Sequence, residues 1–277
     1  MSGPERHPGA VQGALLRRRE AGGKALVPFV TAGITPDWTA YLQACADNGA
    51  DAIEIGLPFS DPMLDGPVIQ AASGQALDRG VRTAELLDEV AALDCGVPLI
   101  VMTYSNIVGR HGNEAFCQRL SAAGISGLIV PDTPVDEIEP LLSAARAAGL
   151  ELILLVAPST KPHRVSRIAE LSSGFVYAVS NMGTTGLRDA VSDTVQRTVA
   201  AIRSHTALPV LVGFGISSPD QAVQASQHAD GVVVASTLMR DVLAGASAPE
   251  LGATVASFRS ALDGIELSAC SAGRVED

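Results

Sequence analysis

Short runs of apolar residues alternate along this chain with longer, Ala-rich segments in which apolar positions recur at helical spacing. Continuous short apolar runs are typical of parallel strands that helices cover on both faces. The eight runs that predict strands are Ala25–Thr31, Ala52–Leu57, Pro98–Tyr104, Gly127–Asp132, Glu151–Ala157, Phe175–Ser180, Val210–Phe214 and Gly231–Ala235.

The segments between these runs carry residues that commonly start and stop helices. Ala123-Gly124 and Ala148-Gly149 suit helix C-termini, and Ser218-Pro219 suits a helix N-terminus. The segments that predict helices are Trp38–Asp47, Thr83–Leu93, Ala115–Ala123, Glu137–Ala148, Ser192–Ser204 and Pro219–Gln227.

Eight strand–helix units without a linker rich in Pro, Gly or Ser predict a single-domain (β/α)8 TIM barrel for the 277-residue chain. We place the barrel at about residues 20–265. An extra N-terminal helix at Ala10–Arg19 is expected to close its bottom, and Ser268–Asp277 to form a frayed tail. An open doubly wound sheet is the alternative, but eight regular repeats favour closure.

Composition narrows the possible functions without identifying one. The net charge of −11 argues against nucleic-acid binding, which needs clustered Lys and Arg. Four scattered cysteines without a CxxC pair argue against a disulfide framework or a zinc knuckle and favour a reducing, cytoplasmic location. The mean hydropathy of +0.27 comes from short apolar runs, none of which approaches the ~18 residues of a membrane span.

Two carboxylates stand where a TIM barrel carries its chemistry, at and after the end of a strand. Glu54 lies between Ile53 and Ile55, and alternation along the strand points it into the barrel. Burial there would raise the pKa of the carboxyl group, as suits a general acid/base, although a purely structural Glu is as plausible. Asp65 follows in a loop held by Pro62, Gly66 and Pro67, where it can be positioned while still moving with a lid. A lone Asp in a loop is more often a turn former or a helix cap.

Three segments in the second half suggest a phosphate-binding cradle. They are Gly183–Gly186 after the sixth strand, Gly213–Gly215 at the end of the seventh, and Ala235-Ser236 at the end of the eighth. Glycines let backbone N–H groups approach a phosphate, and a helix that starts at Ser236 would favour an anion. Ordinary turn glycines are the alternative reading.

Aromatic residues also gather at strand ends and can line a flat apolar pocket, although each alone is more typical of ordinary core. They are Phe29, Tyr104, Tyr177 and Phe214. The histidines lack metal-site spacing, and neither Lys24 nor Lys161 is placed to form an imine. The residues alone therefore suggest a carbon–carbon lyase or isomerase that acts on a phosphorylated, partly aromatic substrate without a metal.

Three stretches carry a more specific resemblance: Val27–Gly33, Glu54–Pro67 and Gly213–Ser217. In order and spacing, over roughly residues 10–265, the chain resembles the tryptophan synthase alpha chain family. The resemblance implies retro-aldol cleavage of indole-3-glycerol phosphate to indole and glyceraldehyde 3-phosphate.

The resemblance also implies roles for single residues. Glu54 corresponds to the catalytic acid/base. Asp65 corresponds to the catalytic carboxylate that accepts a hydrogen bond from the indole N–H, and Thr185 is expected to orient Asp65. The substrate-binding positions that the resemblance implies are Phe29, Tyr177 and Thr185, and the aromatic pattern adds Tyr104 and Phe214. The phosphate-binding positions are Gly186, Gly215, Ala235 and Ser236; the family usually has Gly where Ala235 stands.

Members of the family pair with a tryptophan synthase beta chain in an alpha2–beta2 heterotetramer. The pyridoxal phosphate belongs to that partner, so we expect no cofactor or metal in this chain. The loop Pro58–Asp65 would face the beta chain. Two alternatives stay open: a stand-alone lyase that releases free indole, and a non-catalytic subunit that activates a beta chain.

Overall fold

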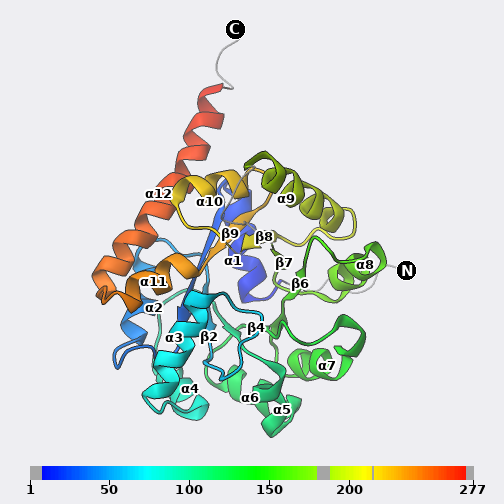
Figure 1. Ribbon diagram of the computed structural model, residues 1–277. Coiled ribbons are helices and arrows are strands. Elements are labelled where there is room, and N and C mark those ends of the chain that lie inside the picture. Colours follow the sequence, from blue (N-terminus) through cyan, green and yellow to red (C-terminus); the bar gives the residue numbers. More distant parts are fainter. Residues whose placement is uncertain (1–7, 180–187, 214, 273–277) are drawn as a thin grey trace.

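The computed structural model describes residues 8–179, 188–213 and 215–272, with the side chains of 188–192 and 265–272 left aside (Figure 1). Within these residues nine parallel strands form one sheet in the order β5-β4-β3-β2-β1-β9-β8-β7-β6. The strands are β1 Ala25–Thr31, β2 Ile53–Gly56, β3 Leu99–Met102, β4 Gly127–Ile129, β5 Glu151–Leu152, β6 Leu154–Val156, β7 Val176–Val179, β8 Val210–Gly213 and β9 Gly231–Val234.

The sheet closes on itself because its two end strands are parts of one stretch of chain. Only Ile153 separates β5, which pairs with β4, from β6, which pairs with β7. The fifth predicted strand is thus divided in two, and the TIM-barrel prediction is confirmed. The first predicted strand, Ala25–Thr31, matches β1 at both ends, and the other predicted strands extend a few residues beyond the described ones. Leu57, for example, leaves β2 but still donates its N–H to the Met102 carbonyl at 2.9 Å.

Helices surround the strands (Figure 1). They are α1 Ala10–Glu20, α2 Thr39–Asp47, α3 Pro67–Asp78, α4 Thr83–Ala91, α5 Ser105–His111, α6 Asn113–Ala122, α7 Glu139–Ala147, α8 Pro162–Leu171, α9 Arg188–Arg203, α10 Pro219–Ser226, α11 Ser236–Leu243 and α12 Ala248–Ala272, with a short 3-10 turn at Val135–Glu137. The sequence analysis missed α3, α5, α8 and α12. In α3 and α8 a proline at the first turn begins the helix, a position where its missing N–H costs nothing.

Helix α1 forms the expected N-terminal closure. In Figure 1 this helix crosses the barrel axis, and its own side chains Val11 and Leu15 are buried. The carboxylate of Glu151, at the start of β5, accepts hydrogen bonds from Val11 N at 2.7 Å and Gln12 N at 3.0 Å. A buried carboxylate thereby satisfies two of the N–H groups that every helix start leaves unpaired.

The last helix differs from the expected tail. Helix α12 continues to Ala272, so the predicted frayed tail is helical from Ser268 to that residue. Along the described part of the chain, none of the helices combines the length and the apolar character needed to cross a bilayer.

Paired residues in neighbouring parallel strands share a face of the sheet, which fixes what the barrel encloses. Phe29 pairs with Glu54, and Glu54 with Ile100. On the other side of the ring Tyr177 pairs with both Leu155 and Leu211. Apart from the partly buried Leu155, these side chains are buried, and they place Glu54 and Tyr177 among the apolar residues inside the barrel.

Candidate active site

Glu54 is a buried carboxylic acid in the barrel, as the strand pattern predicts. The residue is 1% exposed, and its Oε2 atom has no hydrogen-bond partner among the described residues. Burial, with a smaller contribution from the charge of Asp65, raises its pKa to about 8. An uncompensated buried carboxyl group costs stability, and such groups cluster at functional sites. The structural alternative, a Glu held by backbone amides or an Arg, therefore finds no support.

Asp65 lies in the loop between β2 and α3, next to Tyr104, which follows β3 and precedes α5. The Tyr104 hydroxyl donates a hydrogen bond to Asp65 Oδ2 at 3.0 Å and accepts one from Leu64 N at 3.1 Å. Burial raises the pKa of Asp65, and the Tyr104 hydrogen bond opposes that rise. The ring of Tyr104 stacks on Phe59, with centroids 5.0 Å apart and planes at 25°. One tyrosine thus ties both ends of this loop to the barrel.

Tyr177 brings the two carboxylates into one electrostatic environment. Its phenol is buried, and its pKa lies well above 10, first because of burial and then because of the charges of Glu54 and Asp65. The three groups are therefore close enough to influence one another. A neutral phenol beside two carboxyl groups can donate a hydrogen bond but does not ionise near neutral pH.

Two glycines leave room for the aromatic rings. A Cβ atom at Gly56 would overlap the ring of Phe29, and a Cβ atom at Gly213 would overlap Tyr177. Both glycines are buried strand residues, so the rings of Phe29 and Tyr177 occupy the space that a side chain at position 56 or 213 would otherwise fill. Phe29, Tyr104 and Tyr177 thus lie at the barrel mouth with the carboxylates, as the aromatic pattern suggested.

Part of the predicted phosphate cradle lies at the N-terminus of α11. Ala235 is its N-cap residue and Ser236 its first residue, and no side chain caps this end. Gly215 follows β8 with φ of +80°, a left-handed conformation that favours glycine. Thr237 Oγ1 donates to the Ile216 carbonyl at 3.3 Å, which ties the two segments together. Uncapped N–H groups at a helix start are suited to an anion.

Three of the predicted site residues lie outside the described residues. They are Thr185 and Gly186, in the segment after β7, and Phe214, directly after β8. Their assignments stay predictions. Within the described structure, Asp65 accepts a hydrogen bond from the Tyr104 hydroxyl group.

Sequence reasoning missed the polar role of Tyr104 and the stacking role of Phe59. It counted Tyr104 only as an aromatic wall, although a tyrosine at a strand end next to an acidic loop carries a hydroxyl that needs a partner when buried. It also passed over Thr31 and Thr103, whose buried hydroxyl oxygens have no hydrogen-bond partner among the described residues. No cluster of three or more His, Cys, Asp or Glu suited to a metal ion occurs among the described residues.

The chain is similar to known proteins over most of its length. A family profile described as tryptophan synthase alpha chain matches residues 15–261. The tryptophan synthase alpha chain of Gloeobacter violaceus is 49% identical over 243 residues, 86% of each chain. That of Geobacter sulfurreducens is 42% identical over 91% of this chain and 97% of its own.

Solved structures agree with these sequence relatives. A chain of tryptophan synthase from M. tuberculosis superposes with a TM-score of 0.84 at 36% identity, covering 92% of this chain and 99% of that chain. Tryptophan synthase subunit alpha from Legionella pneumophila gives a TM-score of 0.84 at 30% identity, covering 93% and 100%. With two acidic groups and a helix N-terminus gathered at one barrel mouth, these matches make the chain a member of the tryptophan synthase alpha chain family.

Proposed function

We propose that this chain is a carbon–carbon lyase that cleaves indole-3-glycerol phosphate to indole and glyceraldehyde 3-phosphate, with Glu54 and Asp65 as its catalytic residues. The observation that carries the proposal is the placement of Glu54. It is a buried carboxyl group with a pKa of about 8, beside a second carboxylate and a buried phenol at the carboxyl end of the barrel. A group with that pKa is substantially protonated at neutral pH and can both give and take a proton.

Glu54 acts first as an acid and then as a base. It donates its proton to C3 of the indole ring, which makes the bond from C3 to the glycerol side chain cleavable. As that bond breaks, its electron pair returns to the ring, and the side-chain hydroxyl loses its proton to the Glu54 carboxylate. The products are indole and an aldehyde, and Glu54 recovers the proton it gave. No cofactor enters the step.

Asp65 stabilises the positive charge that develops on the ring. Protonation at C3 leaves the ring nitrogen cationic, and a carboxylate that accepts the N–H hydrogen bond favours that intermediate. Tyr104 supports this role because its hydrogen bond favours the ionised form of Asp65 against the effect of burial. The aromatic rings of Phe29 and Tyr177 provide the apolar walls that an indole ring requires.

The phosphate group would bind at Gly215, Ala235 and Ser236, with Gly186 completing the cradle. Support comes from the uncapped N-terminus of α11 and the left-handed backbone at Gly215. Because backbone N–H groups can supply the hydrogen bonds, an acidic, lysine-poor chain can still hold a phosphate. The methyl group of Ala235 narrows the approach that a glycine would leave open.

A tryptophan synthase beta chain is the proposed partner, in an alpha2–beta2 complex whose pyridoxal phosphate is held by the beta chain. The loop between β2 and α3 exposes two large apolar side chains, Met63 at 79% and Leu64 at 47%. Exposed apolar side chains next to a site suit a protein interface. The hydrogen bonds of Tyr104 connect the same loop to Asp65, so contact with a partner here would affect the site directly.

The test is an indole-release assay on the purified chain and on its Glu54→Gln variant, each with and without a beta chain. We expect indole from the wild type, at least ~100-fold slower turnover in the variant, and faster turnover when the beta chain is added. Full activity of Glu54→Gln would overturn the assignment of the acid/base. A rate that the beta chain does not change would identify a stand-alone lyase, and no indole under any condition would identify a non-catalytic subunit.

A further inference from the structure

A second pocket lies outside the barrel, between α8 and α9. It has a volume of about 260 Å³ and is lined by residues from the end of β6, from the loop after it and from the two helices. Leu155 shares the inner face of the sheet with Tyr177, so Val156, the next residue, points to the opposite face and into this pocket. The wall of the barrel therefore separates the pocket from Glu54.

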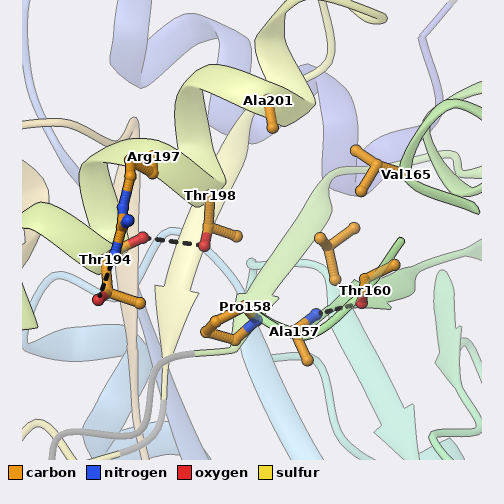
Figure 2. Close-up of a pocket in the computed structure, with 9 residues that line it drawn as sticks. Ala157, Pro158, Thr160, Val165, Thr194, Arg197, Thr198 and Ala201 are labelled. Carbon is orange, nitrogen blue, oxygen red and sulfur yellow. Dashed lines mark hydrogen bonds between the residues drawn. The ribbon is translucent and has the colours of Figure 1, made fainter. Parts of the chain in front are cut away.

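The two ends of this pocket differ chemically (Figure 2). Arg197 and Thr194, both on α9, stand together at one end, whereas Val165 of α8 lies at the other and Ala201 above it. Pro158 forms part of the wall between them. The pocket is thus amphipathic, with a cationic end and an apolar end.

Arg197 carries a charge that the described structure leaves uncompensated. Its contacts are long and stay on its own helix: Nε donates to the Asp193 carbonyl at 3.3 Å, and Nη2 to Thr194 Oγ1 at 3.4 Å. Arg197 forms no ion pair with any of the described side chains. Arg197 is an exposed residue, and its guanidinium retains N–H donors in the planar arrangement that fits a carboxylate.

Hydroxyl groups add polar contacts along the pocket. Thr160 Oγ1 accepts a hydrogen bond from Ala157 N at 2.9 Å, so its own proton stays available as a donor. Thr198, 8% exposed, donates to the Thr194 carbonyl at 2.9 Å, which leaves its oxygen as an acceptor. A ligand with one charged end would meet the guanidinium, and its short body would pass these hydroxyl groups to reach the apolar side chains at the other end.

We propose that the pocket between α8 and α9 is an accessory binding site for a small organic carboxylate with a branched aliphatic body. The carboxylate would pair with Arg197, and the body would lie against Val156, Val165 and Ala201. Inorganic phosphate would gain the charge interaction but nothing from the apolar end. The pocket volume is below that of drug-sized sites, which favours a small occupant.

The probe for this site is 3-methylbutanoate, titrated into the full chain and followed by amide NMR shifts. We expect saturable shifts centred on Thr198 and Ala201, with a Kd of about 0.1–10 mM, since so few atoms offer little contact area. The neutral isostere 3-methylbutanamide should bind at least about tenfold more weakly, because it lacks the charge. Inorganic phosphate should shift these amides less than the carboxylate does at equal concentration.

Variants at both ends make the assignment specific. Arg197→Gln should weaken binding of the carboxylate at least about tenfold, and Ala201→Leu should weaken it by filling the apolar end. Arg167→Gln is the matched control: Arg167 lies on α8, pairs with Glu170 and does not line the pocket, so binding should stay unchanged. Equal affinity of the wild type and Arg197→Gln, equal affinity for the amide, or no saturation by about 50 mM would each overturn the proposal.

Discussion

The phenol of Tyr104 holds the carboxylate of Asp65 through a hydrogen bond of 3.0 Å, and the same oxygen accepts the backbone N–H of Leu64. A single side chain between β3 and α5 thus fixes both the acidic group and the loop that carries it. The stack of Tyr104 on Phe59 holds the ring in place independently of these hydrogen bonds. The two contributions can therefore be separated by substitution.

Tyr104→Phe removes the hydrogen bond and keeps the stacked ring. Since the Tyr104 hydrogen bond lowers the pKa of Asp65, its loss should raise that pKa. Ionised Asp65 would then form at higher pH, and the acidic limb of the pH profile of kcat/KM should shift upward. Turnover at neutral pH should fall about tenfold. Phe59→Leu, the control, keeps the hydroxyl and should leave the position of that limb unchanged; an equal shift in both variants would contradict the role of the hydrogen bond.

Asp65→Asn keeps the shape of the side chain and removes its charge. We expect at least a ~100-fold loss of kcat with substrate binding retained, because the carboxylate is needed most when positive charge develops on the ring. Single-turnover kinetics with a separate binding titration measure the two quantities. Asp61→Asn, in the same loop, is the control and should keep its activity. Wild-type turnover in Asp65→Asn would remove Asp65 from the mechanism.

Glu54 should make stability depend on pH in a definite direction. Its ordinary pKa is 4.5 and its folded pKa is about 8. Between these pH values the Glu54 carboxyl group is ionised in the unfolded chain but keeps its proton in the folded chain. The stability that Glu54 contributes is therefore fully present below pH 4.5 and is lost as the pH rises to about 8. Glu54→Gln should therefore raise the free energy of unfolding at pH 8 more than at pH 4.5. The difference should be a few kcal/mol, since one pKa unit corresponds to about 1.4 kcal/mol.

Urea denaturation of the wild type and Glu54→Gln at both pH values measures this difference. Glu137→Gln serves as the control, because Glu137 lies exposed in the turn before α7. A stability gain in Glu54→Gln that is the same at both pH values would show that the carboxyl group titrates normally in the folded protein.

Gly56→Ala tests how closely Phe29 packs at the barrel mouth. The added methyl group would overlap the Phe29 ring, and we expect a loss of about 1–3 kcal/mol in the free energy of unfolding. Phe29→Leu should recover part of that loss when it is combined with Gly56→Ala, although it destabilises the wild type. A double-mutant cycle from urea denaturation checks the coupling. Purely additive effects would mean that the two residues do not contact each other.

Glu151→Ala should loosen the helix that closes the barrel bottom. The variant leaves Val11 N and Gln12 N without their acceptors, and we expect a loss of about 2–4 kcal/mol, since both bonds involve a charged group. Hydrogen exchange of these two amides should accelerate. Glu137→Ala, with no cap to lose, should leave both amides protected. Unchanged exchange in Glu151→Ala would show that packing of Val11 and Leu15 holds α1 in place without the carboxylate.

The limits of the sequence prediction have physical causes. Apolar runs located the strands because each strand of a parallel barrel is buried on both faces, but Glu151–Ala157 gave no sign that Ile153 interrupts its pairing. Helix α3 was not predicted because Pro67 was interpreted as a loop residue, although proline also occurs at the first position of helices. Glu54 was recognisable because alternation along one strand determines which way it points.

The sequence by itself determined the barrel, the two carboxylates and the family, because these depend on local patterns: alternation within a strand, helix start and stop residues, and one specific run of residues around Glu54. Tertiary structure alone decided which groups meet. Tyr104 is 39 positions from Asp65, and Glu151 is 140 from Val11, so nothing in the local sequence pairs them. The raised pKa of Glu54 is likewise a property of the closed barrel, because burial by residues from many strands removes the water that would keep its carboxylate ionised.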